Sequence, residues 1–253
     1  MKKMMTDTIL EINGLCKKYP GFLLDNVSFS LRRGRIMGLI GRNGAGKTTT
    51  LKSIFNLVHP DRGEIRIFGL TMPENEREIK SRIGYAAGSA DCYKRKKIRD
   101  IVSVTKSFYE SWDDDAYRKY LRAFDIDEGK TPVQLSQGMQ VKLSLTVAMS
   151  HHAELLILDE PTSGLDPVSR AELLDALLFL KDKGVSILYS THITSDLEKC
   201  ADEITYIVRG KLVASDSIGN FISHNNMAGR GNTIEDIMIS FEKEPTIIKS
   251  RGK

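Results

Sequence analysis

The 253-residue sequence predicts an α/β fold that carries an antiparallel β subdomain and an inserted α-helical subdomain. A glycine-rich loop lies between an apolar run and a helix-forming stretch. Several other apolar runs have strand length without alternation, which is typical of parallel strands buried on both faces. From residue 91 to 131, apolar residues instead recur at helical spacing. With 41% hydrophobic and 28% charged residues, the composition is that of a soluble globular protein.

The first strands of the chain are expected to pair in antiparallel hairpins. Thr8–Leu15 alternates polar and apolar residues, and Val27–Leu31 and Gly63–Phe68 are two more expected strands. Lys17–Gly21 contains Pro-Gly and is expected to be a turn that holds a single aromatic residue. These segments form the antiparallel subdomain.

The glycine-rich loop, Gly41–Thr49, fits the phosphate-loop pattern G-x-x-x-x-G-K-[ST] at every required position. An apolar strand, Arg35–Ile40, precedes it, and a helix over Lys47–Leu57 is expected to follow. Glycines let the backbone N–H groups point at phosphate oxygens, and the helix dipole adds partial positive charge there. We expect Lys47 to reach the β- and γ-phosphates and the Thr48 hydroxyl to bind Mg²⁺. The expected ATP-binding residues are Gly41, Arg42, Asn43, Gly44, Ala45, Gly46, Lys47, Thr48 and Thr49.

The helical subdomain is expected to span about residues 91–150. A charged helix, Glu74–Arg82, and a short strand, Ile83–Ala87, precede it. Two apolar stripes at helical spacing indicate core packing rather than ligand contacts, and Trp112 falls between them. The residues of the two stripes are Ile98, Ile101, Val102, Thr105 and Phe108, and then Tyr117, Tyr120, Leu121 and Phe124.

The second half of the chain returns to strands and helices in alternation. Asp166-Pro167 is a favourable helix start, with an acidic N-cap followed by proline at the first helical position. Val185–Tyr189 is the next buried strand, and Ile204–Ser215 is expected to form a hairpin. We place the end of the main domain, residues 1–215, at this point.

Residues 216–253 are expected to form a short C-terminal extension with one helix. Ser223–Asn232 is polar and contains glycine, which favours a flexible connector. Thr233–Phe241 places apolar residues on one helical face, with Thr233 as the cap.

A second motif reduces the number of functions that are compatible with a phosphate loop. Leu155–Glu160 is an apolar strand that ends in two carboxylates. After a phosphate loop, such an aspartate, Asp159, holds Mg²⁺, usually through water. Glu160 would then accept a proton from the attacking water or orient it. The alternative is that both acids merely cap the next turn.

Three further motifs identify a family resemblance. Leu135–Met139 precedes the Asp-Glu strand, Pro161–Asp166 follows it, and Ser190–His192 ends the next strand. In order and spacing they resemble the signature motif, the D-loop and the switch histidine of the ABC ATPases. The resemblance covers about Thr8 to Ser215 and implies a RecA-like P-loop ATPase core, with ATP and Mg²⁺ as cofactors.

The resemblance also assigns roles to residues. Tyr19 would stack on adenine, although packing beneath a turn is the competing interpretation. Ser136, Gln137 and Gly138 would face the γ-phosphate held by a second subunit, at a helix N-terminus. His192 would hydrogen-bond the γ-phosphate and act in catalysis together with Glu160. In the D-loop, the matching residues are Ser163 and Asp166.

Two departures from the family pattern are visible. Gln137 and Met139 occupy positions where the family most often has Gly and Gln. Gly88 stands where the family usually places a glutamine that touches Mg²⁺, and Ser89 or Asp91 could supply an oxygen instead.

Within this family, Ser111–Asp115 and Leu135–Met139 resemble a bacterial subgroup that exports antimicrobial or toxic peptides, such as phenol-soluble modulins, through ABC-2-type membrane subunits. The resemblance implies a homodimer or heterodimer of ATPases on the cytoplasmic face of the cell membrane. A soluble ABC ATPase that acts on ribosomes or nucleic acid, and an importer ATPase, are the alternatives. The single phosphate loop disfavours the first, and a net charge of only +4 gives no indication of a nucleic-acid partner.

Overall fold

The structure is a computed structural model that describes residues 7–87 and 95–243. Its centre is a parallel sheet in which β3 (Ile36–Ile40) lies between β8 (Ser186–Thr191) and β9 (Glu203–Val208). Beyond β8 follow β7 (Leu155–Asp159) and β6 (Ile83–Ala87), also parallel. The carboxyl ends of β3, β7 and β8 therefore meet at one edge, which is where ligands bind in such sheets.

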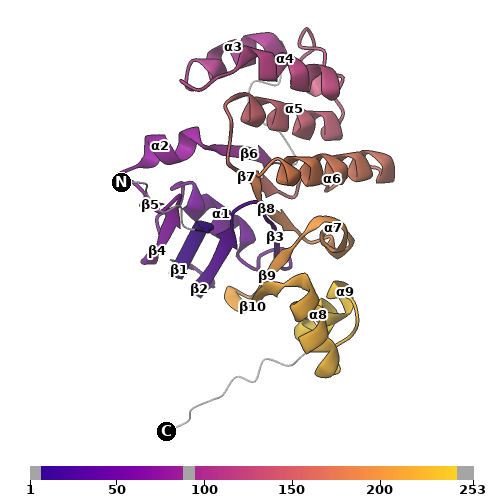
Figure 1. Cartoon of the computed structure of the whole chain (residues 1–253). Helices are drawn as coiled ribbons and strands as arrows, with labels where there is room; N and C mark the ends of the chain where they lie inside the picture. Colours follow the sequence, from indigo (N-terminus) through magenta and orange to yellow (C-terminus); the bar gives the residue numbers. More distant parts are fainter. Residues whose placement is uncertain (1–6, 88–94, 244–253) are drawn as a thin grey trace.

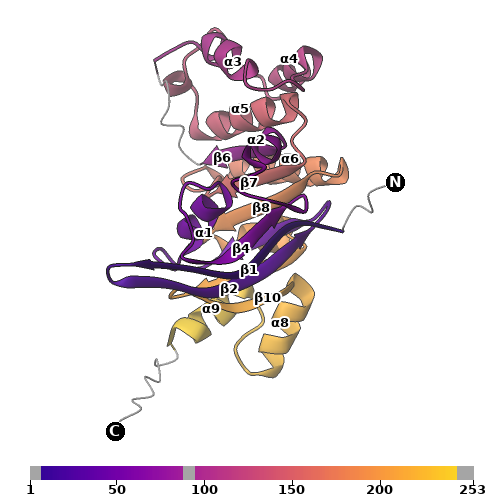
Figure 2. The same ribbon diagram turned by 90° about the vertical axis from the view of Figure 1, so that its left-hand side faces the viewer.

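The antiparallel strands extend the same sheet on the other side of β9, so that the described residues form ten strands in the order β5-β4-β1-β2-β10-β9-β3-β8-β7-β6. Figure 2 shows β1, β2 and β4 side by side below α1. The bounds of these strands are β1 Thr8–Tyr19, β2 Phe22–Arg32, β4 Arg62–Ile67, β5 Leu70–Thr71 and β10 Lys211–Ser217.

The expected turn over Lys17–Gly21 was wrong for most of its length. Strand β1 continues to Tyr19, which pairs with Phe22, and only Pro20 and Gly21 remain in the turn. Gly21 adopts a φ of 79°, which glycine permits in such a tight connection. The polar composition of the segment reflects the exposed end of a hairpin rather than a long loop.

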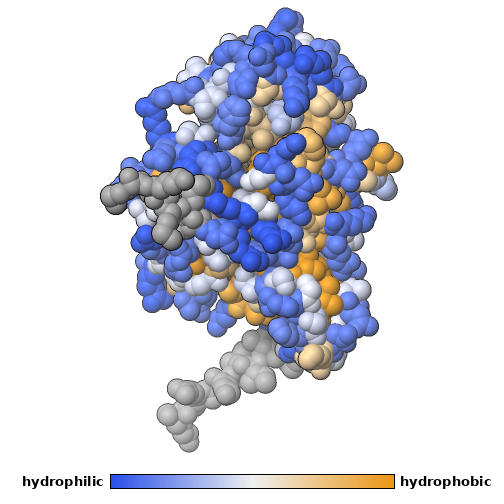
Figure 3. Space-filling model, in the orientation of Figure 1, coloured by the Kyte–Doolittle hydropathy of each residue, from blue (hydrophilic) through white to orange (hydrophobic). Residues whose placement is uncertain are grey.

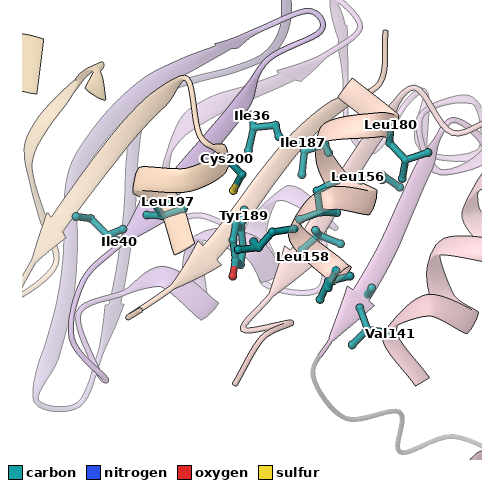
Figure 4. Packing of buried hydrophobic residues seen from close by; sticks show 14 of the residues in the cluster. Ile36, Ile40, Val141, Leu156, Leu158, Leu180, Ile187, Tyr189, Leu197 and Cys200 are labelled. Carbon is teal, nitrogen blue, oxygen red and sulfur yellow. The ribbon is translucent and has the colours of Figure 1, made fainter. Parts of the chain in front are cut away.

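The central strands separate two hydrophobic clusters. In β3, Ile36 and Ile40 belong to one cluster, and Met37 and Leu39 belong to the other. Because successive side chains of a strand point to opposite faces, this alternation buries both faces of the sheet. Figure 4 shows part of the first cluster, with Ile36 near Ile187 of β8 and Ile40 near Leu197.

Helices cover the parallel sheet (Figure 1). Helix α1 (Lys47–Ile54) follows the phosphate loop and ends before the expected Leu57, because Asn56 adopts a left-handed φ of 58°. The other helices near the sheet are α2 Glu76–Ser81, α6 Pro167–Asp182 and α7 Thr194–Cys200. The predicted start of α6 is confirmed, since Asp166 is its N-cap and Pro167 its first residue.

The helical subdomain lies at one end of the molecule, above α6 in Figure 1. It comprises α3 (Ile98–Lys106), α4 (Asp114–Ala123) and α5 (Gln137–Ser150), with a 3₁₀ turn at Pro132–Gln134. Its small core contains the buried residues Ile98, Val102, Tyr117, Leu121, Ile126 and Leu135. Trp112 packs against this core as predicted, but Phe108 does not: it follows the end of α3 and is 74% exposed.

The C-terminal segment differs from the prediction. The expected flexible connector contains the second half of an additional helix, α8 (Ile218–Met227), which precedes α9 (Ile234–Lys243). Ser217 caps α8 by accepting a hydrogen bond from the Asn220 backbone N–H. Phe221 and Ile237 are buried in the same cluster as the central strands. The polar residues of α8 made its sequence resemble a connector. The helix is nevertheless stabilised by the packing of its apolar residues on the sheet.

The face seen in Figure 3 is mostly hydrophilic, with apolar residues visible between the charged ones. Within the described ranges, none of the helices has both the length and the apolar character that crossing a membrane requires.

Candidate active site

The phosphate loop has the backbone that anion binding requires. Gly41, Gly44 and Gly46 all have positive φ angles, of 154°, 81° and 119°. A Cβ on Gly41 would lie 2.4 Å from the Ile207 carbonyl oxygen, and a Cβ on Gly46 would lie 2.7 Å from a methyl group of Leu24. Backbone conformation therefore favours glycine at all three positions, and the close approach of neighbouring strands also excludes a side chain at Gly41 and Gly46.

Lys47 is the first residue of α1 and is almost completely buried. Its Nζ donates a hydrogen bond to the Gly41 carbonyl at 2.6 Å and lies 3.4 Å from Oε1 of Glu160. The lysine thus lies between the start of the phosphate loop and the acid that follows β7. A cation held at this point is well placed to contact phosphate oxygens in the loop.

Glu160 has a strained backbone and two charged or titratable neighbours. Its φ of 50° is in the left-handed region, which is uncommon for residues other than glycine. Its backbone N–H donates to the Ser190 carbonyl at 2.9 Å. Its Oε2 lies 2.8 Å from Nδ1 of His192. One carboxylate therefore joins the phosphate-loop lysine to the histidine at the end of β8.

Asp159 and Thr48 could together hold a magnesium ion. The Thr48 side chain is exposed at the loop, and Asp159 ends β7 on the same cleft. Burial raises the pKa of Asp159 above its ordinary value, and the neighbouring Glu160 carboxylate acts in the same direction. A hydroxyl and a carboxylate are suitable oxygen ligands for Mg²⁺, which keeps several waters and phosphate oxygens in its shell. Among the described residues, no group of three or more histidine, cysteine, aspartate or glutamate side chains could hold a metal ion. Gly88, Ser89 and Asp91 lie outside the described residues.

A cleft of about 750 Å³ connects these groups. Among the described residues, its lining includes most of the predicted phosphate-loop residues together with Asp159, Glu160, Gln137 and Ser163. Its aromatic wall is Phe22, which the sequence analysis did not single out. Tyr19 is adjacent, with its ring centroid 6.5 Å from that of Phe22, but it does not line the cleft. The hairpin register, which sequence alone does not fix, determines which aromatic faces the loop.

The signature and D-loop residues lie at helix starts. Ser136 is the N-cap of α5 and accepts from the Met139 backbone N–H at 3.2 Å. The Gln137 side-chain amide donates to the Ser163 carbonyl at 2.8 Å and so links the two motifs. Asp166 caps α6, accepting from the backbone N–H groups of Val168 and Ser169. Gly138 is buried in the first turn of α5.

Helix α9 reaches the phosphate loop from the opposite end of the sequence. Glu242 lies 3.5 Å from the Arg42 guanidinium. A cavity of about 620 Å³ separates α9 from the loop, with Arg42, His192 and Glu242 among its lining residues. The tail helix, which the sequence analysis placed in a separate extension, is therefore a neighbour of the site.

Comparison with known proteins is consistent with this geometry. The family model described as ABC transporter matches residues 24–163, which include the phosphate loop, the signature helix and the Asp-Glu pair. The chain belongs to the ABC transporter family. Members of this family are ATPases, so ATP binding and hydrolysis are the chemistry of this chain.

Similar ABC proteins include ATP-binding proteins that are named for bacitracin transport and for multidrug transport. Over 210 residues the chain is 33% identical to "Bacitracin transport ATP-binding protein BcrA" of Bacillus licheniformis, covering 81% of this chain and 69% of that one. It is 31% identical over 215 residues to "Probable multidrug ABC transporter ATP-binding protein YbhF" of Escherichia coli, covering 83% of this chain. The chain spans only 37% of the length of that second relative.

A solved structure described as an ATP-binding subunit of an ABC transporter superposes with a TM-score of 0.83. It is 28% identical in sequence, and the match covers 93% of this ABC ATPase and all of that chain. A nucleotide-free ATP-binding cassette, at 19% identity and a TM-score of 0.75, supports the same fold. The predicted α/β class, with its RecA-like P-loop core, is confirmed.

Proposed function

We propose that this ABC ATPase is the energy-coupling subunit of an exporter and works as a head-to-tail dimer. Each ATP would lie between the phosphate loop of one subunit and residues Ser136–Gly138 of the other. In this arrangement the N-terminus of α5 places its dipole and backbone N–H groups toward the γ-phosphate. The position of Ser136 as the N-cap of a 14-residue helix supports this role.

The hydrolytic roles follow from the contacts of Glu160. The carboxylate lies at the end of β7, close to Lys47 on one side and His192 on the other. In our proposal Lys47 binds the β- and γ-phosphates, and Glu160 takes the proton of the attacking water. His192 orients Glu160 and hydrogen-bonds the γ-phosphate. When bound at Thr48 and Asp159, Mg²⁺ neutralises developing charge on the phosphates.

The export direction and the partner rest on the relatives. Two of the similar proteins are named for multidrug and bacitracin transport, which supports an exporter of drugs or peptides, phenol-soluble modulins among them. An ABC-2-type membrane subunit would anchor the ATPase to the cytoplasmic face of the membrane. We place its docking surface on the helical subdomain formed by α3, α4 and α5.

The observation that best supports the ATPase assignment is the position of one carboxylate, Glu160, between the phosphate-loop lysine and the switch histidine.

Replacing Lys47 tests the assignment of the phosphate loop directly. Lys47→Ala is expected to abolish tight ATP binding, because the loop loses its cation for the β- and γ-phosphates. Titration with a fluorescent ATP analogue would measure this. Lys52→Ala, which removes an equal charge from the exposed face of the same helix, is the control and should bind normally. Near-normal affinity in Lys47→Ala would contradict the loop assignment.

Export is tested separately by copurification. A tagged chain expressed together with its genomic neighbours is expected to bring down a polytopic membrane protein. The reconstituted complex should then move a peptide antibiotic outward in an ATP-dependent manner. Uptake instead of efflux, or recovery of ribosomes in place of a membrane protein, would point to one of the alternative functions.

A further inference from the structure

A buried polar chain lies behind the candidate active site and links the loop after β7 to strand β8 and helix α7, the two elements that flank His192. The Thr162 hydroxyl lies 2.7 Å from the Tyr189 hydroxyl, and the Tyr189 hydroxyl donates to Oδ2 of Asp196 at 3.1 Å. All three side chains are fully buried. Because the Tyr189 hydroxyl donates its single hydrogen to Asp196, the Thr162 hydroxyl is the donor to Tyr189.

This polar chain of Thr162, Tyr189 and Asp196 connects the segments that carry the proposed reacting groups. Thr162 lies two residues after Glu160, and Tyr189 lies three residues before His192. Asp196 lies on α7, the helix that follows the histidine. Figure 4 shows the ring of Tyr189 packed in the hydrophobic cluster, with Leu158 and Leu197 nearby. Polar groups buried in such a cluster are costly unless each is paired, so this chain constrains both loops.

Two features show that the region is under constraint. Glu160 has a left-handed backbone, which persists only where the surrounding structure enforces it. Asp196 also has an unused acceptor: its buried Oδ1 accepts no hydrogen bond and lies 4.0 Å from Nε of Arg170, an ion-pair distance at which that Nε likewise makes no hydrogen bond. Arg170 belongs to α6, directly after the D-loop. The polar chain therefore extends toward α6, the helix that follows the D-loop.

We propose that Tyr189 and Asp196 are positioning residues for ATP hydrolysis, which hold the Glu160 loop in register with the loop of His192. Thr162 is their contact on the Glu160 side. Neither Tyr189 nor Asp196 lines the cleft, so their effect passes through the two loops. This inference rests on the proposed roles of Glu160 and His192. The inference predicts that breaking the hydrogen bonds of the polar chain slows the hydrolysis step. ATP binding, which depends on the phosphate loop, should be retained.

Tyr189→Phe is the sharpest test, because it removes one hydroxyl and keeps the buried ring. Steady-state ATPase assays on the full chain should show kcat lowered about 10- to 100-fold, since small displacements of catalytic groups have effects of this size. The KM for ATP should change less than about twofold, because an interaction made only in the transition state alters kcat alone. Asp196→Asn, which can accept the same hydrogen bond from Tyr189 through its amide oxygen, should lose less activity than Asp196→Ala.

Tyr206→Phe is the matched control. Tyr206 is also fully buried, on β9, which β3 separates from β8, and its hydroxyl donates to the Met238 carbonyl at 3.5 Å rather than to Asp196. If the two tyrosine variants lose kcat equally, or if Tyr189→Phe raises KM and leaves kcat unchanged, the positioning role is wrong.

A double-mutant cycle separates this proposal from general destabilisation. Thr162→Val breaks the chain at its other end with a side chain of similar shape. The double variant Thr162→Val/Tyr189→Phe should be little slower than either single variant, because the same connection is already broken. Strictly additive losses would overturn the proposal.

Thr162→Val alone also serves as the test should Tyr189→Phe not fold. If Glu160→Gln keeps full turnover while the cycle remains non-additive, the assignment of Glu160 as the base is wrong, and the positioning role of the polar chain stands.

Discussion

Glu160 is the residue on which the most contacts of the site converge. Its carboxylate contacts Lys47 and His192, and its backbone is tied to Ser190 on β8. A side chain in this position can respond both to what binds in the phosphate loop and to the position of the histidine. Replacing its proton-accepting oxygen should therefore affect turnover more than nucleotide affinity.

Glu160→Gln is expected to keep ATP binding and to lose about 10²–10⁴-fold in kcat, because the amide is nearly isosteric but cannot accept a proton. Phosphate release would measure turnover, and nucleotide titration would measure binding. Full activity in this variant would move the role of the base to another residue.

Glu154 is a second carboxylate with two arginine partners, but it lies at the opposite end of β7 from the active site. Its oxygens lie 2.6 Å from Arg82 Nε and 3.0 Å from Arg33 Nη1. Burial acts to raise the pKa of Glu154, but the two guanidinium groups outweigh it and lower this pKa below its ordinary value of 4.5. The contribution to stability is thus present above pH 4.5 and is lost as pH falls through the lowered pKa.

Glu154→Gln should reduce the free energy of unfolding by about 1 kcal/mol at pH 7, a value kept small because the site is partly exposed. The difference from the unmodified chain should shrink below the ordinary carboxyl pKa. Urea unfolding at pH 7 and pH 4 would measure both. Glu110→Gln removes one partner of the exposed Arg77 pair and should have no measurable effect at either pH.

At the scale of elements, the most informative departure from the sequence prediction is α8. Ser223–Asn232 has the composition of a connector, yet α8 runs to Met227 within it. The helix forms because Phe221 packs edge-on against Tyr206, with ring centroids 6.4 Å apart, and this contact lies outside any local sequence window. By contrast, the phosphate loop was predictable, because its glycines and its helix start are determined by residues next to one another.

The same distinction applies within the site. Asp159, Glu160 and His192 were predictable from their places at strand ends. The aromatic wall formed by Phe22 and the pairing of Tyr189 with Asp196 were not. The wall depends on the register of a hairpin, and the pairing depends on how α7 packs on β8. Sequence patterns report periodicity along one element, but they carry little information on which side chains meet between elements.

Phe221→Ala tests whether α8 is part of the main core. Removing a fully buried aromatic ring of this kind typically costs about 3–5 kcal/mol of unfolding free energy. Denaturant unfolding would measure the loss. Met227→Ala, at an 81% exposed position of the same helix, should be nearly neutral. Equal and small effects would mean that α8 is a dispensable appendage.

At the scale of the whole molecule, the cleft of one chain contains most of the phosphate loop and Glu160, the base in our proposal, while Ser136 begins a helix of the helical subdomain. ATP that binds both in one composite site would favour a closed dimer, because it gains contacts only in that state. A variant that cannot hydrolyse ATP should accumulate this form.

Glu160→Gln with ATP and Mg²⁺ is therefore expected to elute as a dimer in size-exclusion chromatography. Adding Ser136→Asp should prevent this, because aspartate keeps the N-cap but places a negative charge toward the γ-phosphate. Ser217→Asp makes the same change at the cap of α8 and should leave the dimer intact. A dimer that tolerates Ser136→Asp would place the interface elsewhere.

The position of β3 in the sheet has a consequence for how the protein is made. The strand that leads into the phosphate loop is hydrogen-bonded on both sides, to β8 and to β9, and these begin about 150 residues or more later in the chain. At a synthesis rate of about 5–20 residues per second, the ribosome needs roughly 8–30 s to supply the first of these partners. During that interval the apolar strand β3 lacks both of its hydrogen-bonding partners. The nascent chain is therefore expected to acquire its capacity for ATP late in translation, and a chaperone that shields residues 36–40 would act within this interval.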